Sequence, residues 1–297
     1  MKITNKKNLP DVLMQACQAY QKKYEDGKMT NLSVTDLLKP PLMRRLEKEF
    51  DSEIEEDLTD RIWALTGQAL HEVLAKNKVE NTLTEERLKI TIHNVEVSGQ
   101  FDMYFASGLL QDYKFTNVWK IIYNDFEDWI LQLNIYRYLL IKAGFEVNKL
   151  QIVAILRDWQ KTKASREENY PGCQVKIIDI DLLPIKEIEL YLNERVQFHL
   201  YGESIPIEKI EICSKKERWH QDDKYALMKE GRKSAVLLFD NEKDCIRAVD
   251  DYNAAGDTNL FYLEERRGKD TRCELYCRAS KHCPYYKKIL EEQNGKN

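Results

Sequence analysis

The sequence predicts a mixed α/β protein that carries an additional module at its C-terminal end. Apolar residues recur at helical spacing in several segments, whereas residues 87–116 show the two-residue alternation of strands. Five of the seven cysteines lie beyond residue 205, where charged residues become more frequent. We therefore expect a helical N-terminal region over residues 1–60, a core over 61–205 and a cysteine-clamped C-terminal module over 206–297.

Composition narrows the class of protein. With 297 residues, 43% hydrophobic and 32% charged, the chain is typical of globular proteins, and no apolar stretch is long enough to cross a membrane. The first residues lack the apolar segment of a secretory signal, so we expect a cytoplasmic, reducing location without disulfides. The net charge of −4 gives no argument for a nucleic-acid partner. Basic runs between Lys215 and Lys233 and between Arg266 and Arg272 fit either a solvated face or phosphate contacts.

Helical spacing dominates the first part of the chain. We expect a helix over residues 13–24, a short helix capped by Ser33 that ends before Pro40, and a third helix over 41–50. The segment RIWALTGQALHEVLAKN follows with apolar residues at helical spacing. Gly67 and His71, four residues apart, share one face of that helix.

Strand patterns follow from residue 87. RLKITIHNVEVSG, GQFDMYF and LLQDYKF alternate apolar and polar residues, with His-Asn and Ser-Gly turns between them, and predict an antiparallel meander. FEDWILQLNIYRYLLIKAG predicts a long amphipathic helix that ends at Gly144. KLQIVAILRDW then suits a buried strand, and after a polar loop QVKIIDIDLL predicts a strand before a helix that starts near Pro184.

Two acidic residues stand in strands that ought to bury apolar side chains. Asp102 and Asp112 fall on neighbouring predicted strands, so pairing across the Ser-Gly turn would bring their carboxylates together. Two such anions repel unless a cation lies between them, and their hard oxygen atoms suit Mg²⁺ or Mn²⁺. Lys114 shares a strand face with Asp112 and can position or deprotonate a metal-bound water for attack on a phosphodiester. The alternative is a surface hairpin with solvated charges.

Residues on the flanking helices extend this pattern. His71 can supply a further metal ligand, although a single helical histidine is more often structural. Gln132 and Tyr136 stand four apart on one helix face, where they can contact a phosphate or support Lys114, although helical aromatic residues usually belong to the core. The order is a helix with His, a strand with Asp, a strand with Asp-x-Lys and a helix with Gln-x-x-x-Tyr.

At these residues the chain resembles the PD-(D/E)XK nuclease superfamily, in particular the RecB-like branch that includes phage exonucleases and the CRISPR adaptation nucleases with an iron–sulfur cluster. The resemblance lies in GQALH, GQFDMY, QDYK and QLNIY, which span residues 67–136, and SVTDLLKPP also looks like phage-encoded members. It implies a restriction-endonuclease-like mixed sheet flanked by helices.

The resemblance also implies roles for individual residues. His71, Asp102 and Asp112 would ligate the metal together with the Tyr113 carbonyl, Lys114 would be the catalytic lysine, and Gln132 and Tyr136 would form the QxxxY motif. This branch often has Glu where Asp112 stands. The implied activity is that of an Mg²⁺- or Mn²⁺-dependent DNA exonuclease on single-stranded or duplex ends, working with recombination or replication proteins in a bacterial or phage-infected cell.

The C-terminal cysteines form a second candidate site. Cys273, Cys277 and Cys283 follow the spacing C-x3-C-x5-C, which in a reducing compartment favours a metal, and Cys213 is the expected fourth ligand. Cys17, Cys173 and Cys245 stand in contexts typical of small buried residues. The spacing fits either Zn²⁺ or a [4Fe–4S] cluster, and it also fits cysteines that are unrelated and bind no metal.

The resemblance favours the [4Fe–4S] cluster. The similar nucleases usually have C-x2-C-x5-C and take the remote cysteine from upstream of the nuclease core, whereas Cys213 lies downstream of it.

A rival function of another class is a module that keeps this fold and binds nucleic acid or a recombination partner without cutting. Both aspartates and Lys114 argue against it, because binding alone has no need of a buried like-charge pair.

Overall fold

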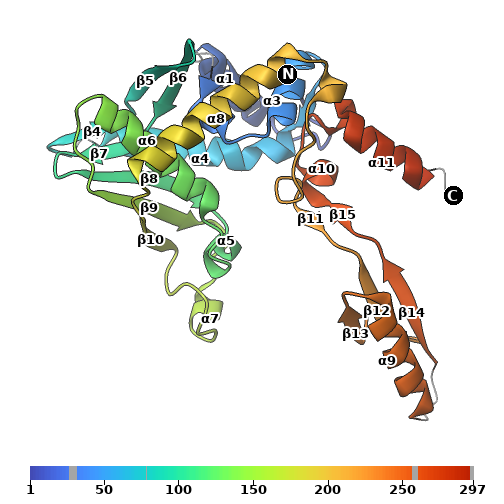
Figure 1. Cartoon of the computed structure of the whole chain (residues 1–297). Coiled ribbons are helices and arrows are strands. Elements are labelled where there is room, and N and C mark those ends of the chain that lie inside the picture. The colour runs from blue at the N-terminus through green and yellow to red at the C-terminus, as the bar shows by residue number, and fades with distance from the viewer. Residues whose placement is uncertain (27–31, 78, 256–259, 295–297) are drawn as a thin grey trace. The chain divides into compact units, whose positions relative to one another are not determined.

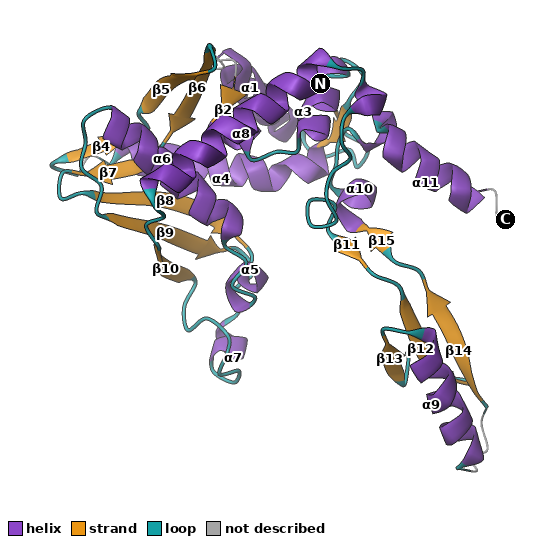
Figure 2. Ribbon diagram, in the orientation of Figure 1, coloured by secondary structure: helices purple, strands orange, loops and turns teal. Residues whose placement is uncertain are grey.

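The structure is a computed structural model that describes residues 1–26, 32–77, 79–255 and 260–294. It divides into two compact units, Met1–Ile210 and Glu211–Asn297, which are described separately below. Several sheets are flanked by helices (Figure 2), so the predicted α/β class is confirmed. Within the described ranges, no helix is both long enough and apolar enough to cross a membrane.

The first residues of the larger unit are mainly helical, as predicted. Ser33 caps its short helix through a reciprocal capping box, in which its hydroxyl accepts the Asp36 N–H while the Asp36 carboxylate accepts the Ser33 N–H. A short parallel strand pair that the sequence did not indicate joins the start of the chain to residues 55–57. The elements are β1 (Lys2–Thr4), α1 (Asp11–Asp26), α2 (Val34–Leu37), α3 (Pro41–Glu49) and β3 (Glu55–Asp57).

A five-stranded sheet forms the centre of the larger unit (Figure 1). Its order is β10-β9-β8-β7-β4; β8 and β9 run parallel, and the other neighbours are antiparallel. The parallel pair requires a crossover, which the helices between β8 and β9 provide. Because β8 is the middle strand, its inward side chains lie in the core. The strands are β4 (Thr82–Thr84), β7 (Met103–Phe105), β8 (Leu109–Thr116), β9 (Lys149–Leu156) and β10 (Val175–Ile180).

The predicted meander is divided between two sheets. The hairpin of β5 (Arg87–Ile92) and β6 (Val95–Gln100) is present, but it pairs with β2 (Leu32–Ser33) in a separate three-stranded sheet. The chain crosses from this sheet to the five-stranded one at Phe101 and Asp102, which belong to neither strand. Asp102 therefore lies at a junction between sheets, and not within a strand as its alternating pattern suggested.

Helices cover both faces of the central strand. α6 (Glu127–Lys142) contacts β8 and β9 and also β5 and β6, so it joins the two sheets, and α8 (Ile185–Ser204) packs on α6. α4 (Leu58–Lys76) approaches the other face of β8, where Gly67 lies close to Phe115. Two short helices complete the unit, α5 (Val118–Ile122) and α7 (Lys161–Ala164). Buried side chains from these helices and both sheets form the main core.

Two glycines allow close approaches that other residues would block. Gly108, in the Ser-Gly turn between β7 and β8, has φ +88°, and a Cβ there would lie 2.6 Å from the Asn148 side chain. Gly99 on β6 faces α6, and a Cβ there would lie 2.7 Å from both Tyr136 and Leu139. The Gly99 backbone thus sets how closely Tyr136 packs against the smaller sheet.

The smaller unit contains a three-stranded sheet of order β13-β12-β14 with α9 packed on it (Figure 1). Leu227, Cys245 and Phe261 form the centre of its small core. A two-stranded pair, β11 with β15, precedes the C-terminal helices. The elements are β11 (His220–Gln221), β12 (Lys224–Lys229), β13 (Leu237–Phe239), α9 (Glu242–Ala254), β14 (Phe261–Arg266), β15 (Lys269–Asp270), α10 (Thr271–Leu275) and α11 (Pro284–Asn294).

Candidate active site

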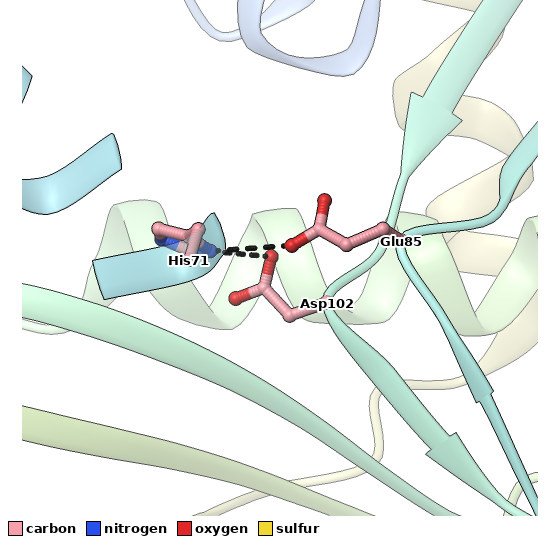
Figure 3. A group of neighbouring side chains, drawn as sticks. All are labelled: His71, Glu85 and Asp102. Atoms are coloured by element: carbon pink, nitrogen blue, oxygen red, sulfur yellow. Dashed lines mark ion pairs between the residues drawn. The ribbon is translucent and has the colours of Figure 1, made fainter. Parts of the chain in front are cut away.

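His71, Glu85 and Asp102 form a compact group that suits a metal ion (Figure 3). The Nδ1 atom of His71 lies 3.3 Å from Oδ1 of Asp102 and 3.5 Å from Oε1 of Glu85. One ligand atom from each of the three residues falls within 4.8 Å of the other two. All three side chains are half-buried, so a small ion could reach them from solvent.

Three different segments present these side chains. His71 lies on α4, Glu85 lies between β4 and β5, and Asp102 lies at the junction between β6 and β7. The Glu85 N–H donates to the Asp102 carbonyl over 3.0 Å, and Glu85 has a positive φ of 56°. A glutamate rarely adopts that conformation, which here turns the chain so that Glu85 meets Asp102.

The charges of this group favour a cation. Hydrogen bonds to Asp102 and Glu85 raise the pKa of His71 to about 10, although partial burial acts in the opposite direction. In the metal-free protein a proton on the imidazole therefore provides positive charge between two carboxylates. Two carboxylates with one imidazole nitrogen fit Mg²⁺ or Mn²⁺, and the nitrogen favours Mn²⁺ of the two.

Asp112 and Lys114 form a buried ion pair on the middle strand. Nζ of Lys114 lies 2.6 Å from Oδ2 of Asp112, whose side chain is 2% exposed. Burial raises the pKa of Asp112, and Lys114 offsets part of that effect. Burial lowers the pKa of Lys114, but Asp112 and then Asp102 outweigh it and raise the pKa above its ordinary value. Lys114 is thus an ammonium in the metal-free protein.

Gln132 and Tyr136 continue this pair onto α6. Nζ of Lys114 donates to Oε1 of Gln132 over 2.9 Å, and Nε2 of Gln132 donates to the Tyr136 hydroxyl over 2.9 Å. Burial, and then the nearby Asp112 carboxylate, raise the pKa of Tyr136. The phenol therefore stays protonated and keeps a proton to donate.

The predicted ligands are gathered, but they fall into two subgroups. Asp112 is not a member of the compact group with His71, because its carboxylate pairs with Lys114. The link between the subgroups is Tyr113, whose backbone N–H donates to Oδ2 of Asp102 over 2.6 Å. Asp102 also contributes to the raised pKa of Asp112, so the two carboxylates act on each other as expected.

Glu85 is the member of the group that sequence reasoning missed. It stands next to Glu86 in a polar turn between two strands, where acidic residues are ordinarily solvated. Its spacing from His71 and Asp102 follows no motif. The available signal was a second acidic residue close in sequence to the predicted pair, which is too common to single out one position.

Gln100 and Arg87 hold Glu85 in place. Nε2 of Gln100 donates to both the backbone carbonyl and Oε2 of Glu85, over 3.1 and 2.8 Å. Arg87 in turn donates to Oε1 of Gln100 over 2.8 Å and to the Ser98 hydroxyl over 3.1 Å. This network leaves Oε1 of Glu85 directed at His71. A layer of this kind, behind the ligands, orients them for a metal.

The four candidate cysteines of the smaller unit lie within electrostatic range of one another. Burial raises the pKa of Cys213 to about 12, and Glu217, Cys283 and Cys277 add to the effect. Burial likewise raises the pKa of Cys273 to about 12, and Asp270 and the other three thiols contribute. All are free thiols. The structure therefore brings Cys213 to the C-terminal group, although the sulfur atoms do not form as compact a group as His71, Glu85 and Asp102.

A buried polar network supports the cysteine segments. The Arg218 guanidinium lies 3.1 Å from Oδ2 of Asp270 and also donates to the Cys213 carbonyl. His220 and Tyr285 make further hydrogen bonds to Asp270, over 2.8 and 2.7 Å. This network ties the loop after Cys213 to the segment around Cys273.

The remaining cysteines and the basic runs clarify two earlier expectations. Cys17 and Cys245 are buried as predicted, whereas Cys173 is exposed in the loop before β10, so its prediction was wrong. Cys173 stands between Gly172 and Gln174, and its thiol donates to the Val175 carbonyl over 2.9 Å. Several cations of the two basic runs have carboxylate partners, as expected of a solvated face: Lys215 with Asp222, Lys224 with Asp240, Arg266 with Glu264, and Arg267 with Glu265.

Two solved structures match this chain at low identity and with TM-scores below 0.5. No protein-family model matches the sequence, and no curated protein is similar to it. A crystal structure of SSO0001 is 17% identical with a TM-score of 0.45, over 63% of this chain and 86% of that one. A candidate exonuclease from Eubacterium rectale is 11% identical with a TM-score of 0.32, over 65% of this chain and 68% of that one.

Proposed function

We propose that the chain is a metal-dependent DNA nuclease that hydrolyses phosphodiester bonds and acts as an exonuclease. The observation that carries this proposal is the His71, Glu85 and Asp102 group beside the buried pair of Asp112 and Lys114. A metal ion held next to a buried ammonium can stabilise the negative charge that develops during phosphodiester hydrolysis. The pKa values of His71 and Asp112 are both strongly shifted. Several shifted groups in one place also favour a functional site.

Each residue has a distinct role in this proposal. His71, Glu85, Asp102 and Asp112, together with the Tyr113 backbone carbonyl, would hold Mg²⁺ or Mn²⁺. The bound ion would polarise the phosphate and lower the pKa of a water. Lys114 offsets the negative charge that develops on the phosphate and orients the attacking water.

Gln132 and Tyr136 restrict the ammonium to one position, because the amide oxygen accepts from Lys114 and the phenol fixes the amide. The resemblance of GQALH, GQFDMY, QDYK and QLNIY to the RecB-like branch supports three further parts of the proposal. These are exonuclease action, DNA ends as the substrate, and a link to recombination or replication proteins.

The test is cleavage of end-labelled single-stranded and duplex DNA with Mg²⁺, with Mn²⁺ and with EDTA. We expect cleavage with either ion and none with EDTA, and products that shorten progressively from one end. Products of internal cleavage would show that the protein is an endonuclease and not an exonuclease. Binding of DNA without cleavage under every condition would favour the silent binding module.

Two variants separate the roles within the site. His71→Ala removes a metal ligand and should shift the Mn²⁺ midpoint of activity upward with little change in DNA binding. Tyr136→Phe keeps the ring and removes the hydroxyl, so it should reduce the rate at saturating metal without moving that midpoint. An unchanged midpoint in His71→Ala would contradict ligation by the imidazole.

We further propose that Cys213, Cys273, Cys277 and Cys283 hold one structural metal centre, a [4Fe–4S] cluster, with Zn²⁺ as the alternative. Their thiols, which lie within electrostatic range of one another, support it. Such a centre has no open coordination position, so it would stabilise the smaller unit and leave cleavage to the other site.

A further inference from the structure

Three large aromatic side chains of the larger unit face solvent near the end of the middle strand, β8. Trp63 on α4, Trp119 on α5 and Tyr123 after α5 are 52%, 48% and 72% exposed. Trp119 and Tyr123 stack with their ring centroids 5.7 Å apart and their planes at 21°. Single exposed aromatic residues need no explanation, but a group of them favours a binding surface.

Cations accompany these rings. The Arg157 guanidinium lies over the Trp63 ring, 4.8 Å from its centroid, and the Lys163 ammonium lies 6.0 Å from the Trp119 centroid. In the part of the chain that the structure describes, Arg157, Lys161 and Lys163 form no ion pair with a carboxylate. Their charge is therefore available to an anionic ligand from outside the chain.

The aromatic and basic group lies against β8, the strand that carries Asp112 and Lys114. Trp63 lies 6.2 Å from the Phe115 ring, and Phe115 directly follows Lys114 on β8. The Arg157 N–H donates to the Thr116 carbonyl over 2.9 Å, and Asp158 accepts the Val118 N–H over 2.8 Å. These bonds fix the loop that carries Arg157 to the end of β8. The aromatic and basic group therefore lies at the C-terminal end of that strand.

We propose that Trp63, Trp119, Tyr123, Arg157 and Lys163, here called the stacking platform, bind single-stranded DNA that enters or leaves the active site. Exposed indole and phenol rings can stack on unpaired bases, whose faces are hidden in a duplex, while Arg and Lys contact the phosphates. The combination of rings with unpaired cations favours nucleic acid over an apolar protein segment. This inference rests on the proposed nuclease function, because it names the substrate form that the site takes.

The binding test uses fluorescein-labelled oligothymidylate in EDTA, measured by fluorescence polarisation. Trp63→Ala and Trp119→Ala should each weaken binding about tenfold. Arg157→Ala and Lys163→Ala should each lower the slope of log affinity against log salt by about 0.7. Matched controls are Phe198→Ala and Tyr201→Ala, which remove equally exposed aromatic residues from α8 and should leave binding unchanged. Trp119→Leu keeps the apolar contact and loses the stacking, so it should bind as weakly as Trp119→Ala.

A second substrate distinguishes failure of the platform from failure of the nuclease. Bis(p-nitrophenyl) phosphate has one phosphodiester and no bases, so its hydrolysis should be unchanged in the platform variants. Normal oligothymidylate binding by both tryptophan variants, or equal losses in the α8 controls, would overturn the platform. If the tryptophan variants lose affinity for duplex DNA to the same extent, the assignment to single-stranded DNA is wrong. Wild-type protein that binds oligothymidylate but hydrolyses neither substrate would overturn the nuclease and still support the platform.

Discussion

Asp102 connects three segments of the chain through one side chain and one carbonyl. Its Oδ1 faces His71 on α4, its Oδ2 accepts the Tyr113 N–H on β8, and its backbone carbonyl accepts the Glu85 N–H. Both carboxylate oxygens are therefore oriented before any ligand arrives. Such preorganisation lowers the cost of assembling a metal site, because the ligands need not be ordered on binding.

At the same scale, the charge of Asp112 is expected to matter for both catalysis and stability. Asp112→Asn keeps the shape but leaves the Lys114 ammonium without its carboxylate, so we expect cleavage to fall at least about 100-fold. Because the pair is buried, we also expect the free energy of unfolding to fall by about 3–5 kcal/mol. Single-turnover cleavage and urea unfolding measure the two effects. If Asp112→Asn cleaves at the wild-type rate, Asp112 has no role in the mechanism.

Gln100 should act on the metal only through Glu85. Gln100→Ala removes both hydrogen bonds that orient Glu85, and we expect Mn²⁺ affinity to fall about tenfold while oligonucleotide binding in EDTA stays unchanged. Calorimetric titration with Mn²⁺ measures the affinity. Gln151→Ala is a matched control, because Gln151 lies on β9 and hydrogen-bonds Gln111 and Asp179 within the five-stranded sheet, whereas Gln100 lies on β6 of the other sheet. Equal losses in both variants would point to general damage to the fold.

At the scale of elements, α6 carries the junction between the two sheets. Its buried residues Leu133 and Leu139 belong to the main core, while Gln132 on the same helix reaches Lys114 on β8. The position of α6 therefore determines whether the lysine is held in place. That position depends on how closely the helix approaches β6.

Gly99→Ala tests this dependence. A methyl group there would lie 2.7 Å from side-chain atoms of Tyr136 and Leu139, so these side chains or α6 must shift, and we expect a loss of about 1–3 kcal/mol in the free energy of unfolding. Cleavage should fall as well, because Tyr136 supports Gln132 and Lys114. Gly172→Ala is the control, since a Cβ at that position would meet nothing within 4 Å. Unchanged stability and cleavage in Gly99→Ala would contradict the close packing.

The contact of α8 with α2 and α3 should make stability depend on pH. Burial, and then Arg195 and Arg44, lower the pKa of His199 from 6.5 to about 4, and a hydrogen bond to Leu37 and the Asp36 carboxylate oppose this only in part. Between these values the unfolded chain binds a proton that the folded chain does not. The free energy of unfolding should therefore be highest above pH 6.5 and fall as the pH drops to about 4, by on the order of 2–3 kcal/mol from His199.

Urea unfolding from pH 7.5 to pH 4 in wild type and His199→Gln measures this contribution. The variant should lose the part of the pH dependence that lies between pH 6.5 and pH 4. His93→Gln removes an exposed histidine and should behave as wild type. Identical pH dependence in wild type and His199→Gln would show that this histidine does not titrate as argued.

At the scale of the whole molecule, the two units have different sources of stability. The larger unit has an extensive apolar core over both sheets, whereas the core of the smaller unit is confined to a few residues such as Leu227, Cys245 and Phe261. A small core rarely supplies enough free energy by itself, and a structural metal is a common remedy. The cysteines lie in segments on either side of β12–β14, so a metal would cross-link those segments.

Metal analysis after anaerobic purification tests the cysteine centre. We expect bound iron and sulfide with broad visible absorption, and Cys277→Ser should lose them together with slow amide exchange in residues 211–294 only. Residues 1–210 should keep their protection, because Cys213, Cys273, Cys277 and Cys283 are all in the other unit. Cys173→Ser, at the exposed cysteine, is the matched control. About one zinc would support the alternative centre, and neither metal with unaltered exchange would contradict both.

The sequence by itself determined the features that depend on neighbouring residues. Two-residue alternation placed Asp112 and Lys114 on one face of β8, and the four-residue spacing placed Gln132 and Tyr136 on one face of α6, where they form a continuous hydrogen-bonded chain with Lys114. The Ser33 cap and the Gly144 helix end also follow from local chemistry. Periodicity operates over a few residues, so it predicts such features without knowledge of the rest of the fold.

Only the tertiary structure decided which segments meet. The division of the meander between two sheets puts Asp102 at a junction, and the positive φ of Glu85 in an ordinary polar turn brings a third carboxylate or imidazole group together with His71 and Asp102. In the same way Trp63 and Arg157 come together from segments far apart in the chain. Such contacts depend on strand register and on the packing of α4 and α6 against the sheets, which are set by the core as a whole and leave no spacing for a sequence pattern to reveal.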